Sequence, residues 1–529
     1  MTLKRFLLLF VLTPVVVLSS AFSLFVSWQK PQFQNNLELY QTNIVLQALA
    51  WQPEDQDGEN VAAIRKSILG ENPLQDATEQ YNKAFISVKT SLDKAKQELG
   101  KLRSQDITAV TPPKPLPSDP IETKVSKLDQ QKQLQQTVTQ QQKLLSKLDL
   151  RLGILQAKQG QTDQALQTWE KLEKISNSTP NPDLIETARV LSGLWSSPPR
   201  LLPNAQKLIQ NNLEGWFRST ALIQLYQLQQ RQDAVLGIQA AQQEAAAEAL
   251  LKFVIIGTVP TFTAFVGLLL LVFLLGQRLV KGKEALLAQN ADRTWSTPWD
   301  GETILQVFVL GFFFMGQLLV PEILALLPIK HSSSNIRFEA FYILVTYLLV
   351  AAGALSVLYV SIKRFFPLPE GWFRLSLRGK WFWWGVGGYC TALPIVIIVS
   401  LVNQKLWQGQ GGSNPLLQLA LESKDSIALG IFFFTAAIAA PLFEELLFRG
   451  FLLPSLTRYL SVGGAIFASS LLFAAAHLSL SEIIPLTALG MVLGTVYTRS
   501  RNLLAPMLLH SLWNSGTLLS LFLLGTSNN

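Results

Sequence analysis

The chain has 529 residues, of which 49% are hydrophobic and only 15% are charged, whereas soluble domains carry about 25% charged residues. The charged residues crowd into positions 30–250 and into short later patches, and the long uncharged stretches between them are typical of membrane spans. The formal net charge of +8 reflects basic residues beside these stretches, where they set topology and meet anionic lipid headgroups. We therefore expect membrane lipid as a partner and exclude nucleic acid. The single cysteine, Cys390, excludes a disulfide framework or a thiolate zinc cluster within one chain.

Nine apolar stretches are long enough, or nearly so, to cross a bilayer, which takes about 20 residues. The first, Phe6–Trp28, lacks the short apolar core of a cleaved signal peptide, and it predicts an uncleaved signal anchor in residues 1–29. The others are Phe253–Leu275, Thr303–Leu327, Phe338–Ile362, Trp381–Asn403, Ile427–Phe448, Val462–Leu478, Ile483–Thr498 and Leu503–Leu524. The sequence predicts an all-α, polytopic bundle of about nine spans, eight of them in residues 251–529. The stretches at 462–478 and 483–498 are short, which leaves the exact number open.

Lysine and arginine residues predict the orientation of this bundle. With the N-terminus in the cytoplasm, the cytoplasmic ends hold 15 of them and the short outer segments hold 4. Because positive charge favours the cytoplasmic side, this count predicts a cytoplasmic N-terminus. Residues 30–250 then form an extracytoplasmic domain.

That domain is predicted to be helical and to offer a surface for a protein partner. Residues 152–172 resemble a tetratricopeptide repeat, with a Leu152-Gly153 pair, Gly160 at the turn, and Ala165 and Trp169 in the second helix. A weaker echo runs from Ala221 to Ala234. Repeats in 150–250 and plain helical hairpins both remain open, because such repeats are stable only in stacks.

Ionisable side chains inside a membrane are costly and indicate function. Glu444 and Glu445 are adjacent near the end of the sixth stretch, and on a helix they point about 100° apart. Glu445 and Arg449 are spaced i, i+4 and can form an ion pair. Glu444 is then free for another partner. The plainer interpretation is an interfacial pair that holds the helix end, with Arg449 reaching the headgroups.

Two of the three histidines lie in later apolar stretches, where one histidine alone is more often a core residue than a ligand. Phe473 precedes His477 by four residues, and His510 precedes Asn514 by four. The order Glu-Glu-x-x-x-Arg, Phe-x-x-x-His, His-x-x-x-Asn resembles the signature of the CAAX-protease and bacteriocin-processing family of intramembrane proteases. The resemblance covers about residues 425–520 by motif.

The resemblance implies a hydrolase in which Glu444 is the general base, His477 and His510 position a water molecule or bind a metal, and Asn514 donates to the oxyanion. Glu445, Arg449 and Phe473 support them. Glu444, His477 and His510 also form a possible ligand set for one divalent metal such as zinc, since a catalytic zinc keeps three protein ligands and a water. A metal-free mechanism by glutamate and histidine is slightly favoured, because each histidine motif supplies only one imidazole.

We therefore expect an intramembrane endopeptidase that acts on a peptide or protein substrate. The alternative is a non-proteolytic membrane scaffold or chaperone that binds partners through its helical domain, and a solute transporter is a third interpretation. The signal anchor and the glutamine-rich domain are typical of a bacterial, and more narrowly a cyanobacterial, protein of the plasma or thylakoid membrane.

Depth along the spans presents a conflict. If the sixth stretch ends at Phe448, Glu444 lies about 6 Å from the cytoplasmic face, at 1.5 Å per residue. His477 ends the seventh stretch and is thereby placed near the outer face. A shared site then requires residues 462–485 to form a short or broken helix pair inside the bundle.

Overall fold

A computed structural model describes residues 3–28, 34–51, 69–107, 121–174, 182–326, 335–407, 410–423 and 425–526. The regular elements in these ranges are helices, which confirms the all-α prediction. The chain divides into two compact units. Unit 1 comprises residues 1–34 and 255–526, and unit 2 comprises 35–254 with the last three residues.

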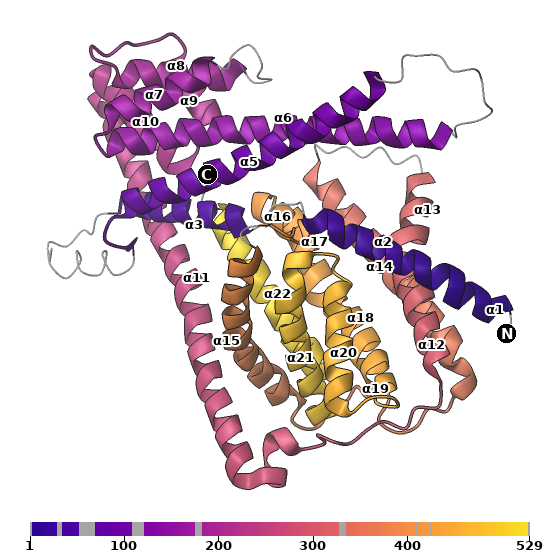
Figure 1. The fold of residues 1–529 in the computed structure, drawn as a ribbon. Helices are drawn as coiled ribbons and strands as arrows, with labels where there is room; N and C mark the ends of the chain where they lie inside the picture. Colours follow the sequence, from indigo (N-terminus) through magenta and orange to yellow (C-terminus); the bar gives the residue numbers. More distant parts are fainter. Residues whose placement is uncertain are drawn as a thin grey trace, which may run out of the picture. The chain divides into compact units, whose positions relative to one another are not determined.

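The regular elements of unit 2 are helices (Figure 1). These are α3 (Gln34–Ala48), α5 (Pro73–Ile107), α6 (Ile121–Lys158), α7 (Thr162–Lys174), α8 (Pro182–Trp195), α9 (Ala205–Asn212), α10 (Gly215–Leu228) and the first part of α11 (Gln232–Lys281). Their apolar side chains form a main core that includes Tyr81, Trp169 and Phe217, and a smaller cluster lies between α5 and α6.

The predicted hairpin at 152–172 is formed by the end of α6 and by α7. Gly160 lies at the turn with a φ of 79°, a backbone conformation that glycine adopts without steric cost. Trp169 is fully buried, and its indole nitrogen donates to the carbonyl of Leu150 over 3.3 Å. A Cβ atom on Gly153 would lie 2.3 Å from that nitrogen, so the glycine provides the space for the tryptophan. The hairpin is real, whereas the assignment as a tetratricopeptide repeat stays a prediction.

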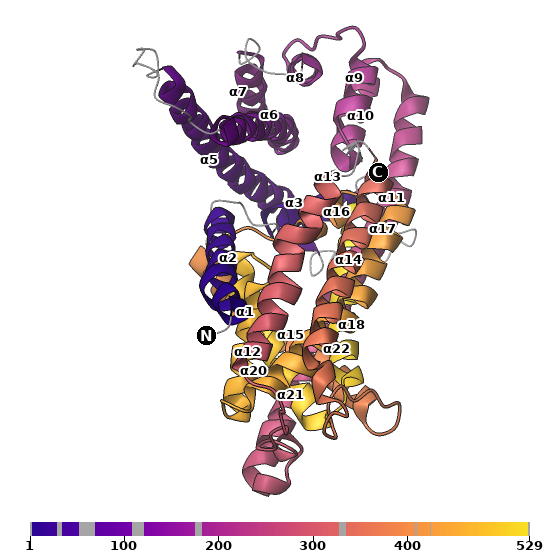
Figure 2. The ribbon, with the colours of Figure 1, turned by 90° about the vertical axis from the view of Figure 1, so that its right-hand side faces the viewer.

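The described residues contain eight helical segments that are long and apolar enough to cross a membrane, and the second of them begins in unit 2 (Figures 1 and 2). They are Leu7–Trp28, Gln232–Glu284, Gly301–Leu326, Ile336–Phe365, Trp381–Trp407, Ser426–Leu456, Leu480–Ser500 and Leu504–Gly525. Several are composite. The first joins η1 (Leu7–Leu12) to α2 (Thr13–Trp28), after α1 (Leu3–Phe6). The third joins α12 (Gly301–Gln306), η5 (Val307–Leu319) and α13 (Val320–Leu326).

The remaining elements of unit 1 complete the bundle around the motif residues. They are η3 (Gly282–Glu284), η4 (Leu286–Ala288), α14 (Ile336–Ile362), η6 (Lys363–Phe365), α15 (Trp381–Trp407), α16 (Pro415–Glu422), α20 (Val462–Ala475), η9 (Leu480–Glu482), α21 (Ile483–Ser500) and α22 (Leu504–Gly525).

Of the nine apolar stretches in the sequence, eight are candidate spans among the described residues, and α20 is shorter. Its 14 residues reach about 21 Å, less than the 30 Å of a hydrocarbon core. The expectation of a short helix at 462–478 is confirmed. Its partner α21 is an unbroken helix of 18 residues. Of the helix pair expected at 462–485, only the first member, α20, is therefore short. Because α20 and α21 run antiparallel as a hairpin, the chain still returns to the side from which α20 began.

The sixth segment is longer than the sequence predicts. It runs from Ser426 to Leu456 as α17 (Ser426–Phe433), η7 (Phe434–Ala439), α18 (Ala440–Glu445), η8 (Leu446–Leu452) and α19 (Leu453–Leu456). Glu444 is therefore about 18 Å from the end of this helix, not 6 Å. His477 follows a helix about 21 Å long that starts on the same side, so the conflict in depth disappears.

The contact between Gly153 and Trp169 can be tested by one methyl group. Gly153→Ala places that group against a buried indole, and we expect it to destabilise unit 2 by about 1–3 kcal/mol. Gly237→Ala is the matched control, because a Cβ there meets nothing within 4 Å and alanine favours a helix by about 0.5–1 kcal/mol. Hydrogen–deuterium exchange of residues 150–172 in the full chain measures the effect. Equal exchange in both variants would contradict the packing described above.

Candidate active site

Glu444 and Glu445 are consecutive residues of α18, so their side chains point about 100° apart. Glu445 is fully buried inside the bundle, whereas Glu444 lines a cavity. Helical turns of the wide π type precede and follow this pair, at η7 and η8. Such turns occur frequently at functional sites.

The predicted ion pair between Glu445 and Arg449 is confirmed. The Arg449 Nη1 atom lies 2.8 Å from Glu445 Oε1, and both side chains are fully buried. A second guanidinium nitrogen donates to the carbonyl of Gly490 on α21 over 3.3 Å. The interpretation in which Arg449 reaches the headgroups is thus wrong. Without Arg449, the predicted cytoplasmic ends hold 14 lysine and arginine residues and the short outer segments hold 4. The predicted orientation is therefore unchanged.

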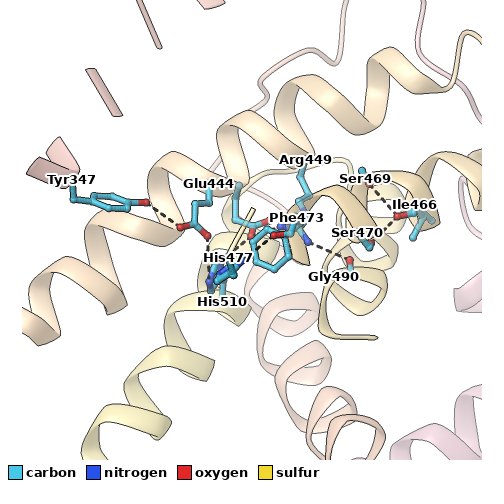
Figure 3. Close-up of polar contacts among 11 residues, drawn as sticks. Tyr347, Glu444, Arg449, Ile466, Ser469, Ser470, Phe473, His477, Gly490 and His510 are labelled. Carbon is cyan, nitrogen blue, oxygen red and sulfur yellow. Dashed lines mark hydrogen bonds and ion pairs between the residues drawn. The ribbon is translucent and has the colours of Figure 1, made fainter. Parts of the chain in front are cut away.

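Glu445 also holds His510, a contact that the sequence did not reveal. His510 Nδ1 lies 2.8 Å from the same Oε1 atom that Arg449 contacts. The other ring nitrogen, Nε2, lies 4.0 Å from Glu444 Oε2. Figure 3 shows the His510 imidazole beside the carboxylate of Glu444. When Nδ1 donates to Glu445, the tautomer presents the Nε2 lone pair to Glu444 and to the cavity.

His477 lies in the turn that follows α20. Its Nδ1 atom is 2.9 Å from the carbonyl oxygen of Phe473, one helical turn earlier, and Nε2 is left for other partners. Phe473 itself is buried, with ring centroids 5.0 Å from His477 and 5.8 Å from His510. The Arg449 guanidinium lies 4.4 Å from the centre of the same ring. Phe473 thus sets the spacing of both imidazoles by packing, which explains its place in the motif (Figure 3).

Asn514 lies one turn after His510 on α22. Its amide nitrogen donates to the carbonyl of Ala436 over 2.7 Å, and the neighbouring Ser511 hydroxyl donates to the carbonyl of Ala437 over 2.6 Å. Both carbonyls belong to η7, so the π turn supplies the acceptors that fix α22 against this helix. One N–H of Asn514 remains for a further acceptor in the cavity.

The four residues predicted to be catalytic, Glu444, His477, His510 and Asn514, line one cavity of about 550 Å³. The convergence that a shared water molecule requires is present. The catalytic roles of the four residues stay predictions, because geometry alone does not assign them.

Two further residues of this cavity were missed. The Tyr347 hydroxyl on α14 donates to Glu444 Oε1 over 3.1 Å. Glu482 in η9 accepts from the backbone nitrogen of Asn414 over 2.9 Å. Tyr347 gives no periodic signal within its apolar stretch. Glu482 was detectable as a carboxylate between two apolar stretches, by the same reasoning that identified Glu444.

Among the described residues, no three His, Cys, Asp or Glu side chains are grouped closely enough to hold a metal ion. The ligand set of Glu444, His477 and His510 stays a prediction, and both histidines leave Nε2 available.

Comparison with known proteins supports the same region. Residues 426–516 match the family described as type II CAAX prenyl endopeptidase Rce1-like. This part of the chain is similar to the CAAX-protease family. The chain is also 25% identical over 214 residues to the membrane-embedded CAAX protease MroQ of Staphylococcus aureus (strain USA300), which covers 38% of this chain and 83% of that protein. No solved structure matches the chain at a significant level. The family and the relative support a protease role for this membrane protein.

The buried ion pair between Glu445 and Arg449 gives a prediction about stability. Glu445→Ala leaves the Arg449 charge buried without its carboxylate, and breaking a buried pair costs about 3–5 kcal/mol. We expect a low yield and a clearly lower apparent melting temperature of the purified protein in detergent. Replacing both partners with apolar residues of similar size, Glu445→Leu with Arg449→Met, removes the stranded charge and should recover most of the loss. A Glu445→Ala protein as stable as the wild type would contradict this account.

Proposed function

We propose that this protein is an intramembrane endopeptidase in which Glu444 activates a water molecule for attack on a peptide bond. The observation that carries the proposal is the position of Glu444 Oε2, on the cavity and 4.0 Å from His510 Nε2. This distance is too long for a direct hydrogen bond and is typical of polar groups bridged by water.

The division of labour follows from the hydrogen bonds. Arg449 already balances the charge of Glu445, and His510 donates Nδ1–H to Glu445 and accepts from water at Nε2. Tyr347 donates to Glu444 Oε1 and so leaves Oε2 as the proton acceptor. His477 Nε2 is an alternative acceptor to His510 Nε2, because a water molecule donates only two hydrogen bonds and Glu444 takes one of them.

The reaction then proceeds in two steps. Glu444 takes a proton from the water, and the water oxygen bonds to the carbonyl carbon, which gives a tetrahedral intermediate with a negative oxygen. The second N–H of Asn514 donates to that oxygen. Glu444 then gives its proton to the amide nitrogen, the carbon–nitrogen bond breaks, and a carboxylic acid and an amine leave.

Unit 2 is proposed to recruit the protein substrate or a protein partner. It contains a groove of about 1020 Å³ lined mainly by amide and other polar side chains, among them Asn72, Gln156, Gln161 and Gln164. Each side-chain amide carries a donor and an acceptor, which suits the N–H and C=O groups of a peptide backbone. The scaffold interpretation uses this groove without the catalytic step.

The proposal predicts that Glu444→Gln abolishes proteolysis and keeps the fold, because glutamine has similar size and accepts from Tyr347 but cannot take the proton. General acid–base catalysis contributes about 10²–10⁴-fold. The measurement compares protein termini in membranes that contain the wild-type chain, the Glu444→Gln variant or neither. Termini that appear with the wild type alone support the endopeptidase. If Glu444→Gln produces the same termini, Glu444 is not the base, and if neither protein changes them, the scaffold interpretation is preferred.

Orientation is a second part of the proposal. The excess of basic residues at one side predicts a cytoplasmic N-terminus, with residues 30–250 on the outer side of the membrane. We propose that this membrane is the plasma or thylakoid membrane of a bacterium, more narrowly a cyanobacterium. A protease added to right-side-out vesicles should therefore cut within unit 2 and spare a tag at the N-terminus. Protection of unit 2 with cleavage of the tag would reverse the topology.

A further inference from the structure

The charges around the proposed active-site cavity are unbalanced. Glu444 and Glu482 both line it, together with two imidazoles, and none of the described lining residues is a lysine or an arginine. The buried Arg449 is not among the lining residues and is paired with Glu445. The described wall thus offers two carboxylates and no permanent positive charge.

Glu482 is held firmly in this wall. It ends η9, in the turn between α20 and α21, and its Oε1 atom accepts from the backbone nitrogen of Asn414. The backbone N–H and C=O groups of the adjacent Ser481 are both hydrogen-bonded. Its backbone nitrogen donates to the carbonyl of Gly411 over 3.1 Å, and its carbonyl accepts from Asn403 Nδ2 over 2.7 Å. The carboxylate therefore has a defined position before any substrate arrives.

The second oxygen of Glu482 has no hydrogen-bond partner among the described residues, although His477 lies within electrostatic range. A carboxylate in such a confined, partly apolar cavity is costly unless a positive charge balances it. The free carboxylate at the C-terminus of a peptide would raise that cost, whereas a lysine or arginine side chain would lower it.

We propose that Glu482 is a specificity-determining residue that selects an internal peptide segment with a lysine or arginine side chain near the bond to be cut. This inference rests on the proposed endopeptidase function. The positive side chain pairs with Glu482 at the His477 end of the cavity, and the segment continues past Glu444. Substrates whose free C-terminal carboxylate must enter the cavity are disfavoured.

The test uses the full chain in detergent and a peptide library. The library is prepared by cutting a bacterial membrane proteome with a glutamate-specific endopeptidase, which leaves lysine and arginine intact inside the peptides. Cut sites are sequenced for the wild type, Glu444→Gln, Glu482→Gln and Glu422→Gln. Glutamine at 482 keeps the acceptor for Asn414 and removes only the charge. Glu422 lies exposed on α16 outside the cavity and is the matched control for a lost carboxylate.

We expect wild-type cuts that require Glu444 and that show lysine or arginine at one fixed position. For a peptide made from the best site, acetylation of that lysine removes the charge and should lower kcat/KM about tenfold to a hundredfold, the range of a hydrogen bond to a charged group. Glu482→Gln should abolish this ratio, and Glu422→Gln should leave it unchanged.

Other outcomes overturn the proposal and remain distinguishable. Cuts that require Glu444 but show no basic preference, or a preference that survives Glu482→Gln, refute the role of Glu482 alone. A uniform fall in kcat with the preference intact assigns Glu482 to the orientation of His477 instead. If the wild type makes no cuts that require Glu444, the endopeptidase itself is refuted, and the inference with it.

Discussion

The arrangement of the site depends on one carboxylate oxygen, Glu445 Oε1. It contacts Arg449 on its own helix and His510 on α22, each at 2.8 Å. Arg449 in turn reaches the carbonyl of Gly490 on α21 and the ring of Phe473 on α20. Four helical segments thus meet at one buried ion pair. Because a buried charge without a partner costs several kcal/mol, this contact selects one packing of those helices and orients the imidazole that faces the cavity.

A short helix inside a membrane leaves backbone groups that water cannot satisfy. The turn after α20 meets this constraint through groups from elsewhere in unit 1. The Ser27 hydroxyl at the end of α2 accepts from the nitrogen of Leu480 over 3.1 Å and donates to the carbonyl of Gly411 over 2.6 Å. A Cβ atom on Gly412 would lie 2.6 Å from the Ser27 hydroxyl, so the close approach requires glycine there. The first span is therefore part of the structure that surrounds the site, beyond any role as an anchor.

Motif spacing was sufficient to predict which polar side chains converge, and the i, i+4 rule predicted the ion pair. The depth of Glu444 was not predictable in the same way. In the sequence, the charge of Arg449 ends the apolar stretch at Phe448 and so suggests the end of the span. A fully paired arginine is compatible with the interior of a helix, and only the tertiary partners Glu445 and Gly490 reveal that pairing. Tyr347 was hidden for a related reason, since a tyrosine within an apolar stretch gives no signal until its hydroxyl finds a carboxylate across the bundle.

Adjacent carboxylates serve different purposes here because a helix turns by 100° per residue. Glu445 is directed into the packed interior, where its charge is permanently balanced and contributes to folding. Glu444 is directed into a cavity, where its free oxygen is available to a proton. The His510 imidazole lies between them. Its Nδ1 atom is 2.8 Å from Glu445 Oε1, and its Nε2 atom faces Glu444 Oε2 at 4.0 Å. The buried ion pair thereby fixes the His510 imidazole at the wall of the cavity. Stability and the proposed chemistry therefore depend on the same residues.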